Sequence, residues 1–211
     1  KLEKEPISWT TFYKFYTSKF DACKKLTKKT DYCDSCCKFH VSLLAKITET
    51  EKEEIQKKLK DHLDLAANAR LLYVEHSKLQ QPDTYICSFD YSENILVPHL
   101  IETPGIFFFK TRRKIDLFGI TNESTDRQLN FLIDEPFKIP KGPNSVISML
   151  NYYIKRNIPE GAKLIFYADN CAAQNKNSTM IAYLCYLAKI IKRHPQIELY
   201  FMISGHIQNS V

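Results

Sequence analysis

Two aspartates in this sequence lie where acidic side chains could bind metal ions. Asp90 falls within the β-rich run Tyr85 to Tyr91, and Asp169 directly follows the apolar run 164–168. An acid in an apolar strand is costly to bury without a partner. Mg²⁺ prefers carboxylate oxygens, and two ions about 4 Å apart can hold both sides of a phosphodiester. The pattern predicts a Mg²⁺ or Mn²⁺ site at these two residues; the alternative is a turn-flanking Asp90 and a helix-capping Asp169.

A second group of candidate ligands lies near the N-terminus. Cys33 and Cys36 have the two-residue spacing of half a zinc site, in which one turn directs both thiolates at one ion. His62 lies in a predicted long helix, which a shared Zn²⁺ would fasten to the cysteines. The fourth ligand stays open among Cys37, His40 and Cys23. The alternative is a cluster of buried free thiols.

Strand-like and helix-like segments alternate after Pro82 in an order that positions the two aspartates. This order is typical of a ribonuclease-H-like α/β fold, with a mixed five-stranded sheet and flanking helices. Its first and fourth strands are neighbours because crossovers are right-handed, so Asp90 and Asp169 should lie together. The predicted strands are 85–91, 106–109 with 114–120, 129–133, 164–168 and 198–203, and the predicted helices are 145–156 and 177–193.

The first part of the chain is predicted to be helical. Thr48 to Leu79 forms one amphipathic pattern, in which Thr50 and Glu53 fit a capping box. Pro82 then ends the helical pattern, because proline cannot continue a helix. We therefore predict an N-terminal helical segment with the zinc site over 1–81, and a ribonuclease-H-like domain over 82–211.

The sequence resembles a transposon-derived animal family that is related to DDE-type transposases. Residues 169–177, Asp-Asn-Cys-Ala-Ala-Gln-Asn-Lys-Asn, resemble its DNC-x-x-QNKN signature. Phe89-Asp90 and Gly205-His206 resemble its FD and GH motifs, and Cys33 with Cys36 resembles its D-x-C-x-x-C segment. The resemblance implies metal-dependent cleavage or strand transfer of DNA, with a third acid on a helix after the GH motif.

Two features depart from the family pattern. Ser145 stands where the family typically has Glu, and the sequence stops at Val211 before any third acid. We therefore expect a domain that is truncated before its last helix. The alternative function is a catalytically inactive, domesticated module that binds DNA or protein, and an RNA-processing nuclease is a weaker third reading.

Polar residues near the second aspartate are candidates for contact with nucleic acid. Lys176 could neutralise a phosphate. The side-chain amides near it, at the predicted start of a helix, could cap that helix or contact phosphate. His206 could assist proton transfer or contact the scissile phosphate; a structural histidine at a strand end is the alternative. The predicted nucleic-acid-binding residues are Gln174, Asn175, Lys176 and Asn177.

Composition gives weaker guidance on partners. The chain has 211 residues, 30 Lys and Arg against 24 Asp and Glu, and a formal charge of +6, which suits DNA as a partner. It lacks the run of about 18 apolar residues that spans a bilayer, so no membrane partner is expected; self-association stays open. Clustered cysteines without an export signal favour an intracellular protein, and a DNA substrate implies the nucleus.

Overall fold

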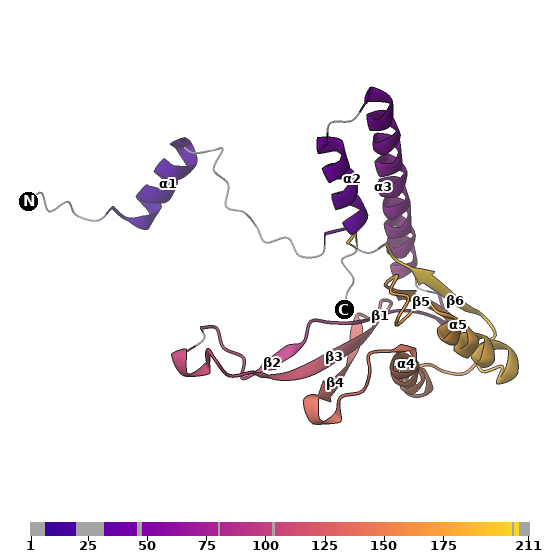
Figure 1. Cartoon of the computed structure of the whole chain (residues 1–211). Coiled ribbons are helices and arrows are strands. Elements are labelled where there is room, and N and C mark those ends of the chain that lie inside the picture. The colour runs from indigo at the N-terminus through magenta and orange to yellow at the C-terminus, as the bar shows by residue number, and fades with distance from the viewer. Residues whose placement is uncertain are drawn as a thin grey trace, which may run out of the picture. The chain divides into compact units, whose positions relative to one another are not determined.

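The computed structural model describes residues 7–19, 32–45, 48–79, 81–102, 104–203 and 205–206. The chain forms two compact units, Lys1–Thr30 and Asp31–Val211. The first unit contains helix α1 (Trp9–Lys19), and the second contains all the other described elements (Figure 1). The sequence-based boundary after residue 81 falls within the second unit, which contains the sheet together with Cys33, Cys36 and His62.

A mixed six-stranded sheet forms the centre of the second unit. Strand β1 runs antiparallel to β3 and parallel to β5, while β6 runs parallel to β5. Both β2 and β4 pair with β3 in antiparallel fashion. The strands are β1 (Thr84–Tyr91), β2 (Ile95–Val97), β3 (Arg113–Asn122), β4 (Arg127–Asp134), β5 (Lys163–Ala168) and β6 (Ile197–Phe201).

The sheet therefore has one strand more than the five predicted. The additional strand is β2, which is only three residues long. The predicted strand over 106–109 is wrong, because this segment contains the 3₁₀ turn η1 (Gly105–Phe107). Pro104 precedes that turn, and a proline cannot donate a hydrogen bond to a strand ladder.

Helices cover both faces of the sheet. One face, which carries the larger hydrophobic core, is covered by helix α4 (Pro143–Asn157) and helix α5 (Ser178–Cys185). Helix α5 continues as the π-helical turn η3 (Tyr186–Ile190), which also contributes to this core. Helix α3 (Glu49–Ser77) packs against the other face. The larger core contains Cys87, Phe89, Phe118, Ile120, Leu150, Ile154, Leu164, Phe166 and Met180, and the α3 face buries Tyr73, Ile86, Ile165, Tyr167 and Met202.

Alternation along the strands decides which face each aspartate occupies. Successive side chains of a strand point to opposite faces. Cys87 and Phe89 of β1 belong to the core under α4 and α5, and Ile86 belongs to the α3 face. Asp90 therefore lies on the α3 face, and the same alternation along β5 places Asp169, which follows Ala168, on that face.

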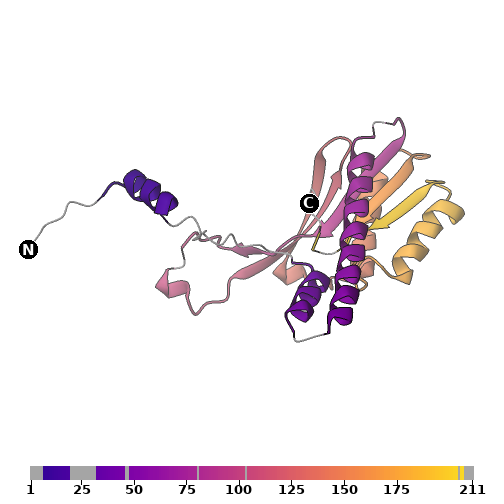
Figure 2. The ribbon, with the colours of Figure 1, turned by 90° about the horizontal axis from the view of Figure 1, so that it is seen from above.

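Helix α2 (Asp34–Leu44) forms a hairpin with α3, and Figure 2 shows the two helices side by side. A capping box starts α3, in which the Thr48 hydroxyl accepts from the amide of Glu51 and the Glu51 carboxylate accepts from the amide of Thr48. The cap lies two residues before the predicted Thr50 and Glu53. Within the described ranges, none of the helices combines the length and apolar character needed to cross a membrane.

Candidate metal sites

Strand register brings the two predicted aspartates to one place. In the parallel pair β1 and β5, Phe89 lies opposite Ala168. Asp90 and Asp169 are the next residues along the two chains, and both occupy the α3 face. The backbone therefore presents two carboxylates at the same end of neighbouring central strands.

Electrostatics show that the two carboxylates interact. Burial and, to a smaller extent, the negative charge of Asp169 raise the pKa of Asp90 from 3.8 to about 6. A hydrogen bond of 2.7 Å from the backbone amide of Tyr91 to Asp90 Oδ1 opposes this shift only in part. Across the described residues, no Lys, Arg or His forms an ion pair with either aspartate. The site thus carries negative charge that a bound cation would compensate.

The turn after β5 holds the Asp169 carboxylate. Oxygen Oδ1 of Asp169 accepts from the backbone amide of Cys171 at 3.2 Å and from the side-chain amide of Asn175. Three successive amides, from residues 174 to 176, donate to the carbonyl of Cys171 and close the turn. Asn175 is only 1% exposed, so its side chain orients Asp169 and is not accessible to a phosphate.

The other three predicted nucleic-acid-binding residues differ from Asn175 in their exposure and hydrogen bonding. Asn177 is the N-cap of α5, where its Oδ1 accepts from the amide of Met180 at 2.9 Å and its Nδ2 donates to the carbonyl of Ala172. Gln174 is half-buried. Lys176 is exposed, and its Nζ lies 5.5 Å from the ring centroid of Phe201. Lys176 and Gln174 are the two of the four whose side chains a ligand could reach most directly.

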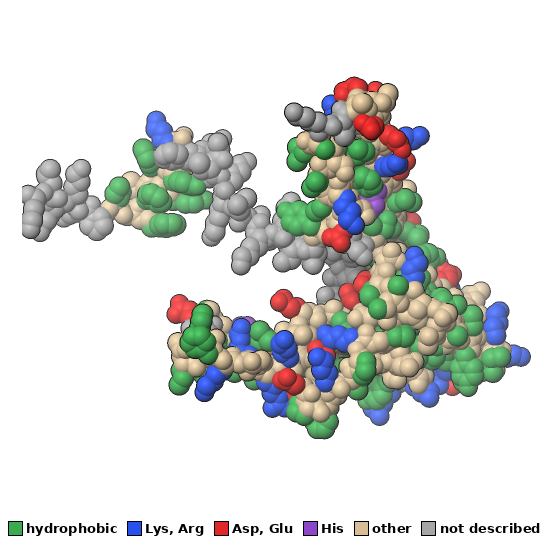
Figure 3. Space-filling view, in the orientation of Figure 1, with side chains coloured by type: hydrophobic (Ala, Val, Ile, Leu, Met, Phe, Trp, Pro, Cys, Tyr) green, Lys and Arg blue, Asp and Glu red, His purple; other side chains and the backbone are tan. Residues whose placement is uncertain are grey.

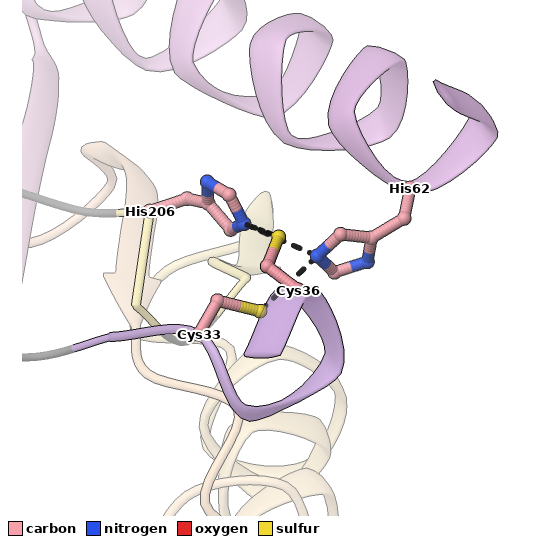
Figure 4. A group of neighbouring side chains, drawn as sticks. All are labelled: Cys33, Cys36, His62 and His206. Carbon is pink, nitrogen blue, oxygen red and sulfur yellow. Dashed lines mark hydrogen bonds between the residues drawn. The ribbon is translucent and has the colours of Figure 1, made fainter. Parts of the chain in front are cut away.

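The cysteine and histidine side chains form a second, separate cluster, shown in Figure 4. The ligand atoms of Cys33, Cys36, His62 and His206 all lie within 4.8 Å of one another. Nε2 of His62 lies 3.1 Å from Cys33 Sγ and 3.1 Å from His206 Nε2, and Cys36 Sγ lies 3.2 Å from His206 Nε2. The structure thus brings together the three predicted zinc ligands and adds His206.

The remaining candidates for the fourth ligand lie elsewhere. Cys37 and His40 are exposed on α2 and do not belong to the cluster, and Cys23 lies outside the described residues. His206, which the sequence analysis assigned to chemistry at the aspartates, has its ring in the cluster. Its spacing from the cysteines gave no indication of this, because it is separated from Cys36 by 170 positions.

Three elements position the four ligands. Cys33 is the N-cap of α2 and Cys36 lies in its first turn, while His62 projects from the middle of α3. His206 follows β6, and the glycine before it makes the approach possible. Gly205 has a φ of +77°, and a Cβ there would lie 2.3 Å from the backbone nitrogen of Cys33. Only glycine allows the two backbones to pass so closely.

The donor set and its spacing fit a tetrahedral metal ion. Zn–S bonds of about 2.3 Å and Zn–N bonds of about 2.0–2.1 Å place neighbouring ligand atoms about 3.3–3.8 Å apart. Without a cation the cluster favours neutral side chains: burial and the neighbouring Cys33 raise the pKa of Cys36, and burial and the neighbouring His62 lower the pKa of His206. A metal ion would favour the deprotonated thiol and the neutral imidazole that ligation requires.

An open pocket adjoins the Cys/His cluster and the residue that follows Asp169. It has a volume of about 480 Å³, and its lining includes Cys33 and His62 of the cluster. Asn170, which follows Asp169, and Ile203, which follows β6, line it as well. The Cys/His cluster therefore borders the loop that carries the second aspartate.

Comparisons with known proteins give distant matches. A family model described as a domain of unknown function, DUF7869, matches residues 110–211. Two solved structures match this chain at low similarity. The Mos1 mariner paired end complex with Mn is 12% identical over 97% of this chain and 70% of that chain, with a TM-score of 0.41. A pre-cleavage Mos1 transpososome is 10% identical over 93% and 68%, with a TM-score of 0.35. The search of curated proteins finds no match.

Proposed function

We propose that this chain is a transposase-derived, ribonuclease-H-like domain that cleaves or joins DNA strands. The observation that carries the proposal is the repulsive carboxylate pair, Asp90 and Asp169, at the ends of two neighbouring parallel strands. The strand order supports it, because three antiparallel strands precede a helix, a strand, a helix and a strand once β2 is set aside. The resemblance to the DNC-x-x-QNKN signature supports it independently of the sheet.

The carboxylates of Asp90 and Asp169 would hold Mg²⁺ or Mn²⁺. Bound divalent ions at such a site supply activation of a water or 3′-hydroxyl and stabilisation of the leaving oxygen. The protein's own contribution is positional: Asn175 and the amide of Cys171 fix the Asp169 carboxylate, and β1 fixes Asp90. The resemblance implies one further acid after the Gly205-His206 motif.

The Cys/His cluster would bind one structural Zn²⁺. Four protein ligands complete a tetrahedral site and leave no position for substrate, which is the arrangement of structural zinc. The ligands come from α2, α3 and the segment after β6, so the ion would fasten the helical hairpin to the sheet beside the Asp169 loop.

The catalytic proposal is tested by Mn²⁺-dependent nicking of supercoiled plasmid DNA by the full-length protein. Asp90→Asn and Asp169→Asn should each reduce nicking at least a hundredfold. Asp64→Asn, an exposed aspartate on α3, is the matched control and should leave nicking unchanged. Equal activity of the wild type and both site variants would contradict the assignment, and cleavage of RNA alone would redirect it to an RNA substrate.

A domesticated binding module is the second candidate, and Ser145 favours it. Where the family pattern has Glu, the Ser145 hydroxyl donates to the carbonyl of Pro140 at 2.6 Å and stabilises the start of α4. Under this alternative, the full-length protein binds DNA without nicking it, and Asp90→Asn leaves its affinity unchanged. Both candidates place the protein in the nucleus, which imaging of a tagged full-length protein would test.

A further inference from the structure

The arm is defined here as the residues between β2 and β3 (98–102 and 104–112) together with the first two residues of β3, Arg113 and Lys114. It extends away from the helices of the second unit in Figures 1 and 2. Its end is apolar and open to solvent: Ile101 is 97% exposed and Phe109 is 92% exposed. Ile106 and Phe108 are also more than two thirds exposed. Exposed apolar groups gathered in this way mark an interaction site more often than a plain surface.

The arm is also rich in basic residues. It holds four Lys or Arg and one Glu, so that it carries a net charge of +3 of the chain's formal +6. Arg113 pairs with Asp134, whereas Lys110, Arg112 and Lys114 form no ion pair with any acidic residue in the described ranges. In the space-filling view, Lys and Arg side chains lie beside the hydrophobic end of the arm (Figure 3).

Three consecutive aromatic residues of the arm are followed directly by its basic residues. The rings of Phe108 and Phe109 pack edge to face with centroids 5.0 Å apart, and Nζ of Lys110 lies 5.9 Å from the Phe107 centroid. Aromatic faces that stack on bases, together with cations that follow a phosphate backbone, are the combination by which proteins hold single-stranded nucleic acid. Free cations beside the rings favour this anionic ligand over a purely apolar protein surface.

The arm begins at the end of the sheet where the aspartates lie. Asp90 is opposite Gly119 of β3, and the arm joins β3 at Arg113. This separation of about six residues corresponds to about 20 Å along the strand. A strand of nucleic acid that contacts the arm can therefore continue toward Asp90 and Asp169.

We propose that the arm binds unpaired DNA that continues toward the position of cleavage, through stacking on Phe108 and Phe109 and phosphate contacts from Lys110 and Arg112. The inference rests on the proposed function for the choice of DNA and for the place of cleavage. Binding itself needs neither Asp90 nor Asp169, so it can be measured separately from catalysis.

The test is the affinity of the full-length protein for a fluorescent oligothymidine and for a duplex of the same length. Fluorescence anisotropy is recorded in zinc-containing buffer without Mg²⁺ or Mn²⁺, over a series of salt concentrations. The Phe108→Ala/Phe109→Ala variant should bind the single strand about five- to 150-fold more weakly for each stacked base that it loses. It should keep the wild-type salt dependence and lose less affinity for the duplex.

The Lys110→Ala/Arg112→Ala variant should instead change the salt dependence. Removal of two phosphate contacts should reduce the slope of log affinity against log salt by about 1.4 for a single strand. Lys57→Ala/Lys60→Ala removes the same charge from the exposed side of α3, and Leu65→Ala/Leu71→Ala removes exposed apolar side chains there. Both controls should retain wild-type affinity and slope.

Three results would overturn the proposal. The first is equal single-strand affinity of the arm variants and the controls, and the second is a larger loss for the duplex than for the single strand. The third is unchanged DNA binding combined with lost self-association or lost binding to anionic vesicles, which would assign the arm to a second copy or to a lipid surface. Failure of plasmid nicking with arm-dependent DNA binding would contradict only the catalytic proposal.

Discussion

The Cys/His cluster and the aspartate pair are two groups of side chains on one side of the same unit, and they are built in opposite ways. The cluster collects Cys33, Cys36, His62 and His206 from three distant parts of the sequence. The pair follows from the register of two adjacent strands, in which Phe89 lies opposite Ala168. Four converging ligands suit a closed structural ion, whereas two carboxylates leave positions for water and substrate.

The two regions also differ in what they do to stability. If the proposed zinc ligands bind a metal only in the folded chain, the binding free energy adds to the free energy of unfolding. The aspartates do the reverse, because burial and mutual repulsion make the charged pair unfavourable until a cation arrives. A structural site and a candidate catalytic site can therefore be separated by how mutation changes stability.

The largest expected effect is the loss of one of the proposed zinc ligands. Cys36→Ala should reduce bound zinc from about one ion per chain to none and lower the unfolding temperature by at least about 10 °C, because several kcal/mol of binding free energy are lost. Zinc content is measured by mass spectrometry of the metal and unfolding by calorimetry. Cys37→Ala removes an exposed thiol next in sequence and should change neither value; a similar loss in both variants would contradict the ligand assignment.

The next largest effect concerns Gly205, where the strain of a positive φ can be distinguished from the close approach to the backbone of Cys33. Gly205→Ala should destabilise the zinc-loaded protein by about 2–5 kcal/mol, from a strained positive φ and a clash with the backbone of Cys33. Gly161→Ala has a similar φ of +85° with no atom near the added methyl, so it should destabilise the protein by only about 1–2 kcal/mol. Chemical denaturation with zinc titration checks both values, and equal losses would argue against the close passage at Gly205.

A smaller effect concerns the pH dependence of the aspartate pair. The pKa of Asp90 is raised to about 6 in the folded chain from 3.8, so the folded state binds the proton more tightly between these values. Stability without Mg²⁺ or Mn²⁺ should therefore fall as the pH rises from about 4 to 6, by about 1–2 kcal/mol for a carboxyl partly screened by water. Asp90→Asn should remove this component from urea unfolding curves, and an unchanged pH profile in that variant would show that Asp90 is not the titrating group.

The smallest effect is at the start of α5. Asn177→Ala should lower stability by about 1 kcal/mol, because the amide of Met180 loses its cap. Asn177→Ser should restore most of the loss, as serine is also a good cap. A loss of DNA affinity in Asn177→Ala that Asn177→Ser does not restore would instead favour the nucleic-acid contact expected from the sequence.

The aspartate pair could be predicted because the order of strand-like and helix-like segments is enough to make the two strands neighbours. Strand-like runs around Asp90 and before Asp169, in the right order, were enough to place the two acids on neighbouring strands. The sequence did not reveal the role of Asn175, since a buried amide and an exposed one look alike in a polar turn. The three-residue strand β2 and the unpaired aromatic run of the arm were missed for a related reason, because pairing depends on neighbours that the pattern does not specify.

The cluster was predictable only in part. The Cys-x-x-Cys spacing and a histidine on a long helix indicated three ligands, but His206 depends on the close passage of Gly205 along Cys33, a contact between the two ends of the second unit. The start of α3 could also not be assigned from the sequence alone, although its residues are close together in the chain. Thr48 with Glu51 and Thr50 with Glu53 both fit the capping pattern, and only the structure selects the first pair.

Direct measurement of Mn²⁺ binding tests whether Asp90 and Asp169 form a divalent-metal site distinct from the Cys/His cluster. Electron paramagnetic resonance of Mn²⁺ added to the zinc-loaded, full-length protein reports the bound ion. We expect binding to the wild type and to Asp64→Asn, and its loss in both Asp90→Asn and Asp169→Asn, with zinc content unchanged throughout. Wild-type Mn²⁺ affinity in both variants would contradict the site assignment.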